Sequence, residues 1–457
     1  MKRFYLFCLF AQPLSAAAGE LPNLVVILAD DLGYGDVGAY GSKQISTPHI
    51  DELAASGVKF TNGYVCSPVC APSRAGLLTG KHPLSFGFSD NLTPPQPGHD
   101  PAFVGLPLSQ KTIADRLKPL GYTNGIIGKW HLGELPQFSP LKRGFDEFWG
   151  YLGGGHDYFR ADPEGDAMAT PILCNFKTPE PLTYLTDDTG NECAHFIRRH
   201  KAAPFFLFAA FAAPHSPMQA TKEDLDAFSH ITDRRRRTYC AMIRSLDRNV
   251  GKIVGEIRSQ GLNRKTLVVF LSDNGGQCAP RMESGASNAP LRGGKTMVLE
   301  GGIRVPMILS WPGKIPAGNT VDGISWALDI APTLLGAAGG KSDGMAGINL
   351  LPHVSENPSA FPERTMMWRY TVGSAIRTGS WKLVRLPDRL PMLFDLSTDP
   401  AELKDLATTH KERTQELLEK LGRWEVLSPN PLFREPADWR VRHLGFYDAT
   451  YPLQQPE

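Results

Sequence analysis

The chain has 457 residues, of which 42% are hydrophobic and 21% are charged, the balance of a globular protein long enough to bury a large core. Its 48 Lys and Arg residues against 47 Asp and Glu residues give a formal charge of +1, which excludes the basic field of a nonspecific nucleic-acid-binding protein. The 45 Gly and 38 Pro residues show no repeat, so a collagen-like structure is excluded and many irregular loops are expected.

Residues 1–18 are predicted to be a secretory signal peptide. Basic Lys2 and Arg3 precede an apolar stretch at 4–14, and the small residues at 15–18 end in an Ala-x-Ala pattern. Cleavage near Ala18 would make the mature protein secreted or periplasmic. No later segment reaches 18 consecutive apolar residues, so we expect no transmembrane segment.

Strand and helix patterns then alternate along the chain, which predicts an α/β layered domain. The apolar runs at 24–28, 204–211 and 266–271 are typical of strands covered on both faces, and 122–127 is predicted to be a short strand. Helices are predicted at 48–56, at 111–120 and, with the longest amphipathic pattern, at 238–259. The basic run at 234–237 is interpreted as a solvated face of this last helix.

The pattern changes after about residue 355. Residues 375–384 and 392–396 are predicted to be antiparallel strands, and 411–424 a closing helix. We therefore predict an N-terminal domain at 19–358 and a smaller C-terminal α/β subdomain at 359–457 with an antiparallel sheet.

Polar residues directly follow three of the predicted strands. Asp30 and Asp31 follow the first, His215 follows 204–211, and Asp273 and Asn274 follow 266–271. Ligands of open α/β sheets bind at the carboxyl ends of strands, although Asp and Asn there are also common turn residues. The oxygen donors suit Ca²⁺ or Mg²⁺ and argue against Zn²⁺.

Cys70 precedes Pro72 and Arg74 at the start of a predicted short helix that ends at Gly80. A side chain at this helix N-terminus lies among free N–H groups that favour an anionic ligand. The residues alone leave two interpretations open, a thiolate nucleophile with a lowered pKa and a disulfide with Cys66.

The run Cys-x-Pro-Ser-Arg at 70–74, continued by Leu-Leu-Thr-Gly at 77–80, resembles the signature of the type I sulfatases. In that family the cysteine is oxidised to Cα-formylglycine. The run at 121–133 resembles a second family signature, departing from it at Asn124, and further matches lie at 291–295, 300–306, 383–384 and 393–400. The resemblance covers 22–407 in family order. It implies an alkaline phosphatase-like fold, with a large, mostly parallel mixed sheet flanked by helices and a small C-terminal antiparallel sheet.

The resemblance also implies a mechanism. Hydrated formylglycine at position 70, made by a formylglycine-generating maturation enzyme, would attack sulfur. A Ca²⁺ ion, with Mg²⁺ less expected, would be held by Asp30, Asp31, position 70, Asp273 and Asn274. In the same mechanism Asp273 would accept the proton of the attacking hydroxyl, and Arg74 and Lys129 would orient the formylglycine. Lys129 and Lys295 would neutralise the charge of the sulfate group, and His215 with Lys295 would protonate the leaving oxygen. His131 would act as the base when sulfate is expelled.

The implied substrate is a sulfated saccharide. The glycine-rich segment that contains His156, Asp157 and Arg160 resembles a pocket-lining loop of carbohydrate sulfatases, although a simple turn fits it equally well. Further candidates for substrate contact are Arg281, Glu283, Trp368 and Arg369. The alternatives are a phosphomonoesterase or phosphodiesterase of the same superfamily, and a sulfated-glycan-binding protein without catalysis. Among the other cysteines, Cys174 and Cys193 are a candidate disulfide.

Overall fold

The computed structural model describes residues 21–451 except 93–99, 163–169, 176, 178–180 and 280–283. The predicted signal peptide therefore lies outside the described residues. The described helices are α1 (Pro48–Ala55), α2 (Cys70–Thr79), α3 (Ile113–Leu117), α4 (Leu185–His200), α5 (Lys222–Asp226), α6 (Arg234–Ser259), α7 (Glu300–Ile303), α8 (Ile330–Ala337), α9 (Lys411–Leu427) and α10 (Ala437–Thr450). Within the described ranges, no helix has the length and apolar character needed to cross a membrane.

The described strands are β1 (Asn23–Ala29), β2 (Val58–Phe60), β3 (Gly63–Tyr64), β4 (Thr123–Lys129), β5 (Glu147–Tyr151), β6 (Leu173–Cys174), β7 (Phe205–Ala210), β8 (Thr266–Ser272), β9 (Met307–Ser310), β10 (Asn319–Val321), β11 (Ser325–Trp326), β12 (Thr365–Tyr370), β13 (Gly373–Thr378), β14 (Trp381–Arg385) and β15 (Met392–Asp395). In this part of the chain they form a nine-stranded sheet of order β10-β2-β9-β8-β1-β7-β4-β5-β6, a β11-β3 pair and a four-stranded sheet. Strands β8, β1, β7, β4 and β5 are parallel, whereas β9 and β6 are antiparallel to their neighbours. The predicted α/β class is confirmed.

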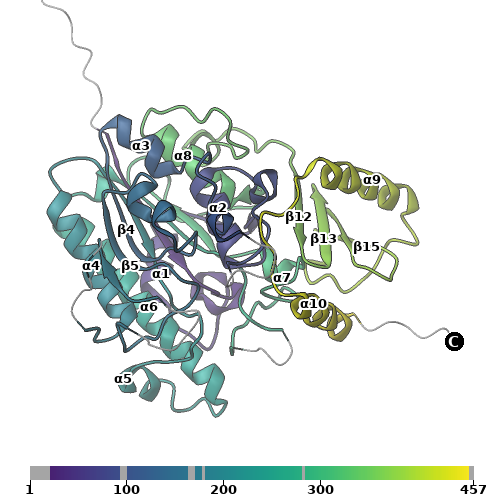
Figure 1. The fold of residues 1–457 in the computed structure, drawn as a ribbon, viewed down its shortest axis with the longest axis horizontal. Helices are drawn as coiled ribbons and strands as arrows, with labels where there is room; N and C mark the ends of the chain where they lie inside the picture. The colour runs from purple at the N-terminus through teal and green to yellow at the C-terminus, as the bar shows by residue number, and fades with distance from the viewer. Residues whose placement is uncertain are drawn as a thin grey trace, which may run out of the picture.

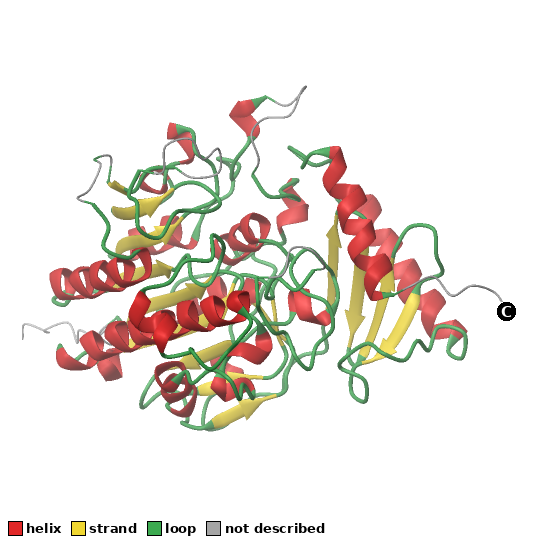
Figure 2. Cartoon of the chain, turned by 90° about the horizontal axis from the view of Figure 1, so that it is seen from below, coloured by secondary structure: helices red, strands yellow, loops and turns green. Residues whose placement is uncertain are grey.

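Each face of the central sheet buries its own hydrophobic core. Leu24, Val26 and Leu28 of β1 point into one core, which α2, α3 and α8 also enter, and Val25 and Ile27 point into the other, formed with α4 and α6. This alternation is the two-residue period of a strand covered on both sides. Figure 2 shows helices on both sides of the sheet. With both faces covered, the carboxyl edge of the parallel strands is the place left for a site.

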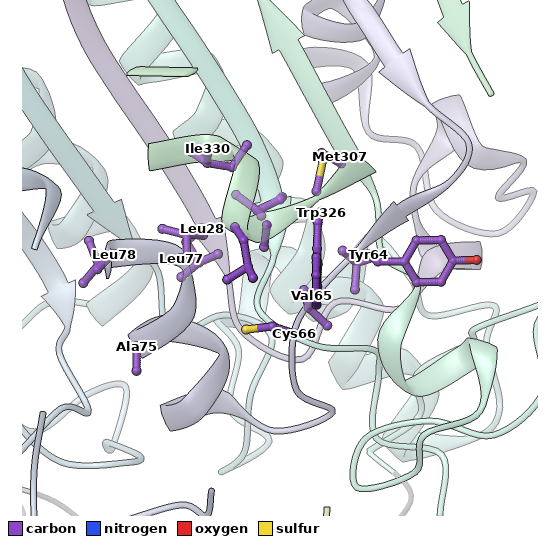
Figure 3. Packing of buried hydrophobic residues seen from close by; sticks show 14 of the residues in the cluster. Leu28, Tyr64, Val65, Cys66, Ala75, Leu77, Leu78, Met307, Trp326 and Ile330 are labelled. Carbon is purple, nitrogen blue, oxygen red and sulfur yellow. The ribbon is translucent and has the colours of Figure 1, made fainter. Parts of the chain in front are cut away.

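Helix α2 is buried along its whole length. It ends at Gly80, whose left-handed φ of +66° favours glycine. Leu77 and Leu78 of α2 pack in one cluster with Leu28 of β1 and Ile330 of α8 (Figure 3). This packing fixes the N-terminal end of α2, and with it residue 70, beside the central sheet.

The C-terminal region forms a separate layer, at the right of Figure 1. Strands β12 to β15 are paired antiparallel in chain order, and Leu417 and Leu421 of α9 pack on one face of their sheet. Trp368 and Tyr370 of β12 belong instead to the core shared with the main sheet. The small sheet is thus held on both faces.

Several predicted elements differ from the structure in their limits. The run 375–384 is a hairpin of β13 and β14 rather than one strand, because Gly379 turns the chain with φ +59°. Helix α3 is shorter than predicted and continues as a 3₁₀ turn over Lys118–Leu120, where Pro119 lacks an amide hydrogen. Helix α6 includes the basic run, and Arg236 in it forms an ion pair with buried Asp36 at 2.6 Å.

The candidate disulfide is wrong. Cys174 is exposed on β6, Cys193 is buried in α4, and both are free thiols.

Candidate active site

Two neighbouring parallel strands bring four oxygen-bearing side chains together. β1 and β8 are paired up to Ala29 and Ser272, so Asp30 and Asp31 leave the sheet beside Asp273 and Asn274. The Asp31 amide donates to Asp273 Oδ1 at 3.2 Å, and Asn274 Nδ2 donates to Asp31 Oδ1 at 2.7 Å. The predicted meeting of these side chains is observed.

The N-terminal end of α2 places Cys70 against this cluster. Its Sγ lies 3.5 Å from Asp30 Oδ1 and 4.0 Å from Asp31 Oδ1. Burial raises the pKa of the Cys70 thiol, and Lys129 and Lys295 only partly oppose the rise. Cys70 and Cys66 are both free thiols, so the interpretation as a disulfide is wrong. The raised pKa argues against a thiolate at position 70.

Three cationic side chains contact the same carboxylates. Lys129, at the end of β4, lies 2.5 Å from Asp30 Oδ2, and Lys295 lies 2.9 Å from Asp31 Oδ2. Arg74 lies one helical turn after Cys70, and its Nε donates to Asp273 Oδ2 at 2.9 Å. Each cation therefore has its shortest contact with a different carboxylate, and Arg74 also lies 3.6 Å from Asp30 Oδ2.

The carboxylates differ in their protonation. Burial alone would raise the pKa of Asp30, but Lys129, His215 and Arg74 hold it far below the ordinary value. Burial and the negative charge of Asp30 raise the pKa of Asp273 to about 7. Asp30 is therefore ionised, whereas Asp273 can exchange a proton near neutral pH.

Two histidines complete the cluster. His131 is buried, and neither of its ring nitrogens has a hydrogen-bond partner among the described residues. His215 Nδ1 lies 2.6 Å from the Ser216 carbonyl, and its Nε2 lies 3.7 Å from Asp31 Oδ2. Burial lowers the pKa of both rings, with Lys129 acting in the same direction on His131 and Lys295 on His215. Both imidazoles are neutral at pH 7.

The donor set fits a hard cation. One atom each of Asp30, Asp31, Cys70 and His215 lies within 4.8 Å of the others. Asn274 Oδ1 is buried and has no partner among the described residues. Carboxylate and amide oxygens are the ligands that Ca²⁺ and Mg²⁺ take in proteins. An oxygen without a partner beside three carboxylates is the arrangement that such an ion completes.

Two site residues have a strained backbone. Asp31 has φ +62° and His131 has φ +57°, in the left-handed region that non-glycine residues rarely adopt. The Asp31 carbonyl accepts from the buried Tyr239 hydroxyl at 2.8 Å, which holds this conformation. Strain of this kind gathers at functional sites, where the surrounding structure over-determines it.

Comparison with known proteins decides the family. Residues 22–340 match the sulfatase family model, and residues 294–426 match the model of the N-sulphoglucosamine sulphohydrolase C-terminal region. The chain belongs to the sulfatase family. Like the other members of this family, the protein is a sulfuric ester hydrolase.

Similar proteins align over most of their length with this sulfatase. N-acetylgalactosamine-6-sulfatase of Rattus norvegicus is 35% identical, over 87% of this chain and 84% of the relative. Arylsulfatase A of Homo sapiens is 32% identical, over 92% of this chain and 90% of the relative. The crystal structure of Ps i-CgsB in complex with k-i-k-neocarrahexaose superposes with a TM-score of 0.85 at 35% identity, over 95% of this chain and 98% of that one.

The predicted substrate-contacting residues of the sulfatase are spread over different environments. His156 is buried near the site, with Nδ1 2.6 Å from the Asp157 carbonyl, and its Nε2 has no partner among the described residues. The Asp157 side chain accepts from the amides of Phe159 and Arg160 and from Gln219, so it holds its own loop. The Arg160 side chain is exposed.

Trp368 does not contact solvent. Its side chain is fully buried, and its indole N–H donates to the Val65 carbonyl at 2.7 Å. The prediction that Trp368 contacts substrate is wrong, because the alternation along β12 turns it into the core. Arg369, the next residue, lines a cavity instead. Arg281 and Glu283 lie outside the described residues.

Two residues of the sulfatase site were not predicted from the sequence. The Tyr151 hydroxyl is buried without a partner among the described residues, close enough to Arg74 and Cys70 to interact with their charges. A Cβ at Gly154 would lie 2.8 Å from His131 Nε2. Only the pairing of β5 with β4, which sets Tyr151 opposite Lys129, brings them there.

Proposed function

We propose that this sulfatase hydrolyses sulfate monoesters of carbohydrates, with position 70 converted to formylglycine. The observation that carries the proposal is the position of Cys70, buried at a helix N-terminus against Asp30 and Asp31. A maturation enzyme would have to reach residue 70 before folding buries it. Export after cleavage near Ala18 belongs to the same proposal.

Asp30, Asp31, Asp273, Asn274 and position 70 would hold a Ca²⁺ ion, with Mg²⁺ as the less expected occupant. A bound dication would polarise a sulfate oxygen and lower the pKa of a hydroxyl at position 70. The buried Asn274 Oδ1 without a partner supports this assignment. Formylglycine would supply, as its hydrate, two hydroxyl groups on one carbon.

The cations of the chain would bind and orient the sulfate group. Arg74 is fixed by Asp273 and Lys129 by Asp30, so both present positive charge without further ordering. Lys295 is fixed by Asp31; burial opposes its charge, but Asp31 raises its pKa, so it stays an ammonium group. Because these cations are already in place before the reaction, no free energy is spent on reorganising them during it.

The remaining residues would move protons. Asp273, close enough to position 70 to act on the charge of its side chain, is suited to take a proton from the hydroxyl that attacks sulfur. The neutral His131 can accept a proton at either free nitrogen, which suits a base that helps to expel sulfate. A sulfate anion bound beside His215 would raise the pKa of its ring, so His215 with Lys295 can protonate the leaving oxygen.

Support for a carbohydrate substrate comes from the relatives. One similar protein is named for N-acetylgalactosamine-6-sulfate, and the structure with TM-score 0.85 is a complex with a neocarrahexaose. The first name describes a sulfated sugar and the second an oligosaccharide. A sulfated oligosaccharide is accordingly the substrate class that we propose.

The test is sulfate release by matured protein from a panel of sulfated oligosaccharides, with phosphate monoesters and diesters beside them. We expect sulfate release that Cys70→Ala abolishes and that Cys66→Ala, at a neighbouring buried cysteine, leaves intact. Mass spectrometry of the peptide 60–74 should show the aldehyde at position 70. A fully active protein with an unmodified thiol would overturn the mechanism. Phosphate release without sulfate release would favour the phosphoesterase, and binding without turnover a glycan-binding protein.

A further inference from the structure

A cavity of about 410 Å³ lies where the C-terminal region meets the N-terminal part of the chain. Its walls come from the end of β12, the end of α9, the segment that follows α9, the start of α10, and Ser89 and Asp90. This volume is within the range of about 300–1,000 Å³ usual for ligand sites. Nothing in the mechanism above uses it.

Three arginines line this cavity, and two of them, Arg434 and Arg440, lie close enough to Asp90 to lower its pKa. Arg369, Arg434 and Arg440 form no hydrogen bond or ion pair with any of the residues that the structure describes, although each lines the same space. The other arginines that hold this region do have partners; Arg385, for example, lies 2.6 Å from Glu425 Oε2. Guanidinium groups left unpaired on one cavity are suited to bind an oxyanion with paired hydrogen bonds.

The acidic residues of the cavity do not cancel this charge. Glu425 is neutralised by Arg385. Burial and the nearby Asp90 raise the pKa of Glu435 to about 7, and both Glu435 oxygens accept from the Tyr370 hydroxyl, at 2.8 and 2.7 Å. Asp90 and Glu435 together therefore carry fewer than two negative charges near pH 7, against three arginines. The cavity has a net positive charge and two carboxyl groups that can accept sugar hydroxyls.

The cavity adjoins the active site through the chain itself. Asn91, next to Asp90 of the cavity wall, accepts from the Ala71 amide at 3.1 Å, directly after Cys70. On the other side, the Tyr447 hydroxyl of α10 accepts from the Val298 amide at 2.8 Å, three residues beyond Lys295. Lys295 is also close enough to Glu435 to oppose the rise in its pKa. The cavity wall is thus held directly against the segments that carry Cys70 and Lys295.

We propose that this cavity is a subsite for an anionic group, a sulfate ester or a carboxylate, on the sugar next to the one that loses its sulfate. Arg369, Arg434 and Arg440 bind the anionic group, and Asp90 and Glu435 face the sugar hydroxyls. The inference rests on the proposed function and deepens it, because it selects polyanionic oligosaccharides over singly sulfated sugars.

The experiment compares four substrates. The first is a tetrasaccharide whose single sulfate is the one to be hydrolysed, and the second and third carry in addition a sulfate or a carboxylate on the adjoining sugar. The fourth is p-nitrophenyl sulfate. We expect kcat/KM for at least one of the two polyanionic substrates to exceed that of the singly charged one by about 10-fold or more, as for charged hydrogen bonds. In R369Q/R434Q/R440Q this preference should disappear, while kcat/KM for p-nitrophenyl sulfate stays within about twofold.

The control variant is Arg442→Gln, which removes an exposed arginine of α10 that pairs with Asp438 and does not line the cavity. It should keep the preference. The subsite is refuted if wild type shows no preference for either anionic neighbour, or if the triple variant loses activity equally on all four substrates. If wild type releases no sulfate even from p-nitrophenyl sulfate, the proposed function fails instead. Calorimetry with Cys70→Ala then tests the subsite alone, and equal affinity for all three tetrasaccharides would overturn it.

Discussion

The described part of this sulfatase buries charge both at the active site and at the junction with the C-terminal region. At the junction, Lys382 lies 2.9 Å from Glu300 Oε1 and 2.8 Å from Glu402 Oε1. The other two oxygens accept from the Tyr64 hydroxyl at 2.5 Å and from the Glu300 amide at 2.8 Å. All four carboxylate oxygens there have a partner, although Glu402 Oε1 has only its ion pair with Lys382.

The active-site cluster is equally buried but incomplete. His131, Asn274 and Tyr151 keep polar atoms without partners among the described residues, and Asp31 and His131 have left-handed backbones. A buried charge network whose bonds are all formed holds a structure together, whereas one that leaves atoms unpaired is prepared for a ligand. The comparison predicts that substitutions in the two clusters act on different quantities.

The largest effect is expected for Asp273→Asn, which removes one proposed metal ligand. Sulfate release should fall on the order of 10³-fold. Removing the charge of Asp273 relieves its repulsion with Asp30 but weakens its buried ion pair with Arg74, so the metal-free variant should lose only a little stability relative to metal-free wild type. Added Ca²⁺ should raise the melting temperature of wild type and leave that of the variant unchanged, since only a ligand bound to the native state stabilises it. Asp247→Asn, at a buried carboxylate of α6, is the control and should keep the Ca²⁺ response.

The second prediction concerns the junction. Lys382→Met leaves Glu300 and Glu402 facing each other without the cation between them. We expect the free energy of unfolding to fall by about 3–5 kcal/mol, the usual cost of breaking a buried ion pair, while kcat per folded molecule changes little. Urea unfolding measures the first quantity and active-site titration the second. Lys404→Met, at an exposed position, should change neither. A large loss of kcat with unchanged stability would contradict the distinction between the two clusters.

Much of the site could be predicted because its residues follow strong local patterns. β1, β7 and β8 are unbroken apolar runs, so the polar residues after them had to gather at one edge of the sheet. The fully buried helix α2 was marked by Pro72 and Gly80 at its two ends. Here the local sequence pattern agrees with the fold, so the sequence was sufficient to predict these elements.

The elements that the sequence did not predict lack such a pattern. Helix α4 has few large apolar residues, because α6 approaches it closely at Gly190, where a Cβ would lie 2.1 Å from Asn249 Oδ1. Strand β5 alternates buried with half-buried positions and contains Glu147, so it did not resemble a core strand. The burial of Trp368 and the cavity at Arg369 depend on contacts between distant segments, which spacing along the chain does not record.

A third prediction tests the contact between Gly154 and His131. In Gly154→Ala the added methyl group would lie 2.8 Å from His131 Nε2, so the ring must shift. We expect kcat to fall by about 10- to 100-fold, the effect of a displacement near 1 Å, with a small change in stability. Gly155→Ala is the matched control, because its nearest neighbours would lie at 3.7 and 3.8 Å, an ordinary contact. Equal kcat in the two variants would refute a role for the position of the His131 ring.

The smallest effect is a pH dependence of stability that originates at the junction. Burial, together with the neighbouring Glu300, raises the pKa of Glu402 to about 7 in the folded protein, above its ordinary value of 4.5. The folded state therefore binds the proton more tightly, so the stability that this group contributes is complete below pH 4.5 and is lost as the pH rises through about 7. Between pH 5 and 8, the free energy of unfolding of Glu402→Gln should decrease by about 1–2 kcal/mol less than that of wild type. The slope with pH is the readout, because the amide also disturbs the hydrogen bond from the Glu300 amide. Glu412→Gln, at an exposed position of α9, should keep the wild-type slope, and an unchanged slope in Glu402→Gln would mean that Lys382 keeps both junction carboxylates ionised throughout this pH range.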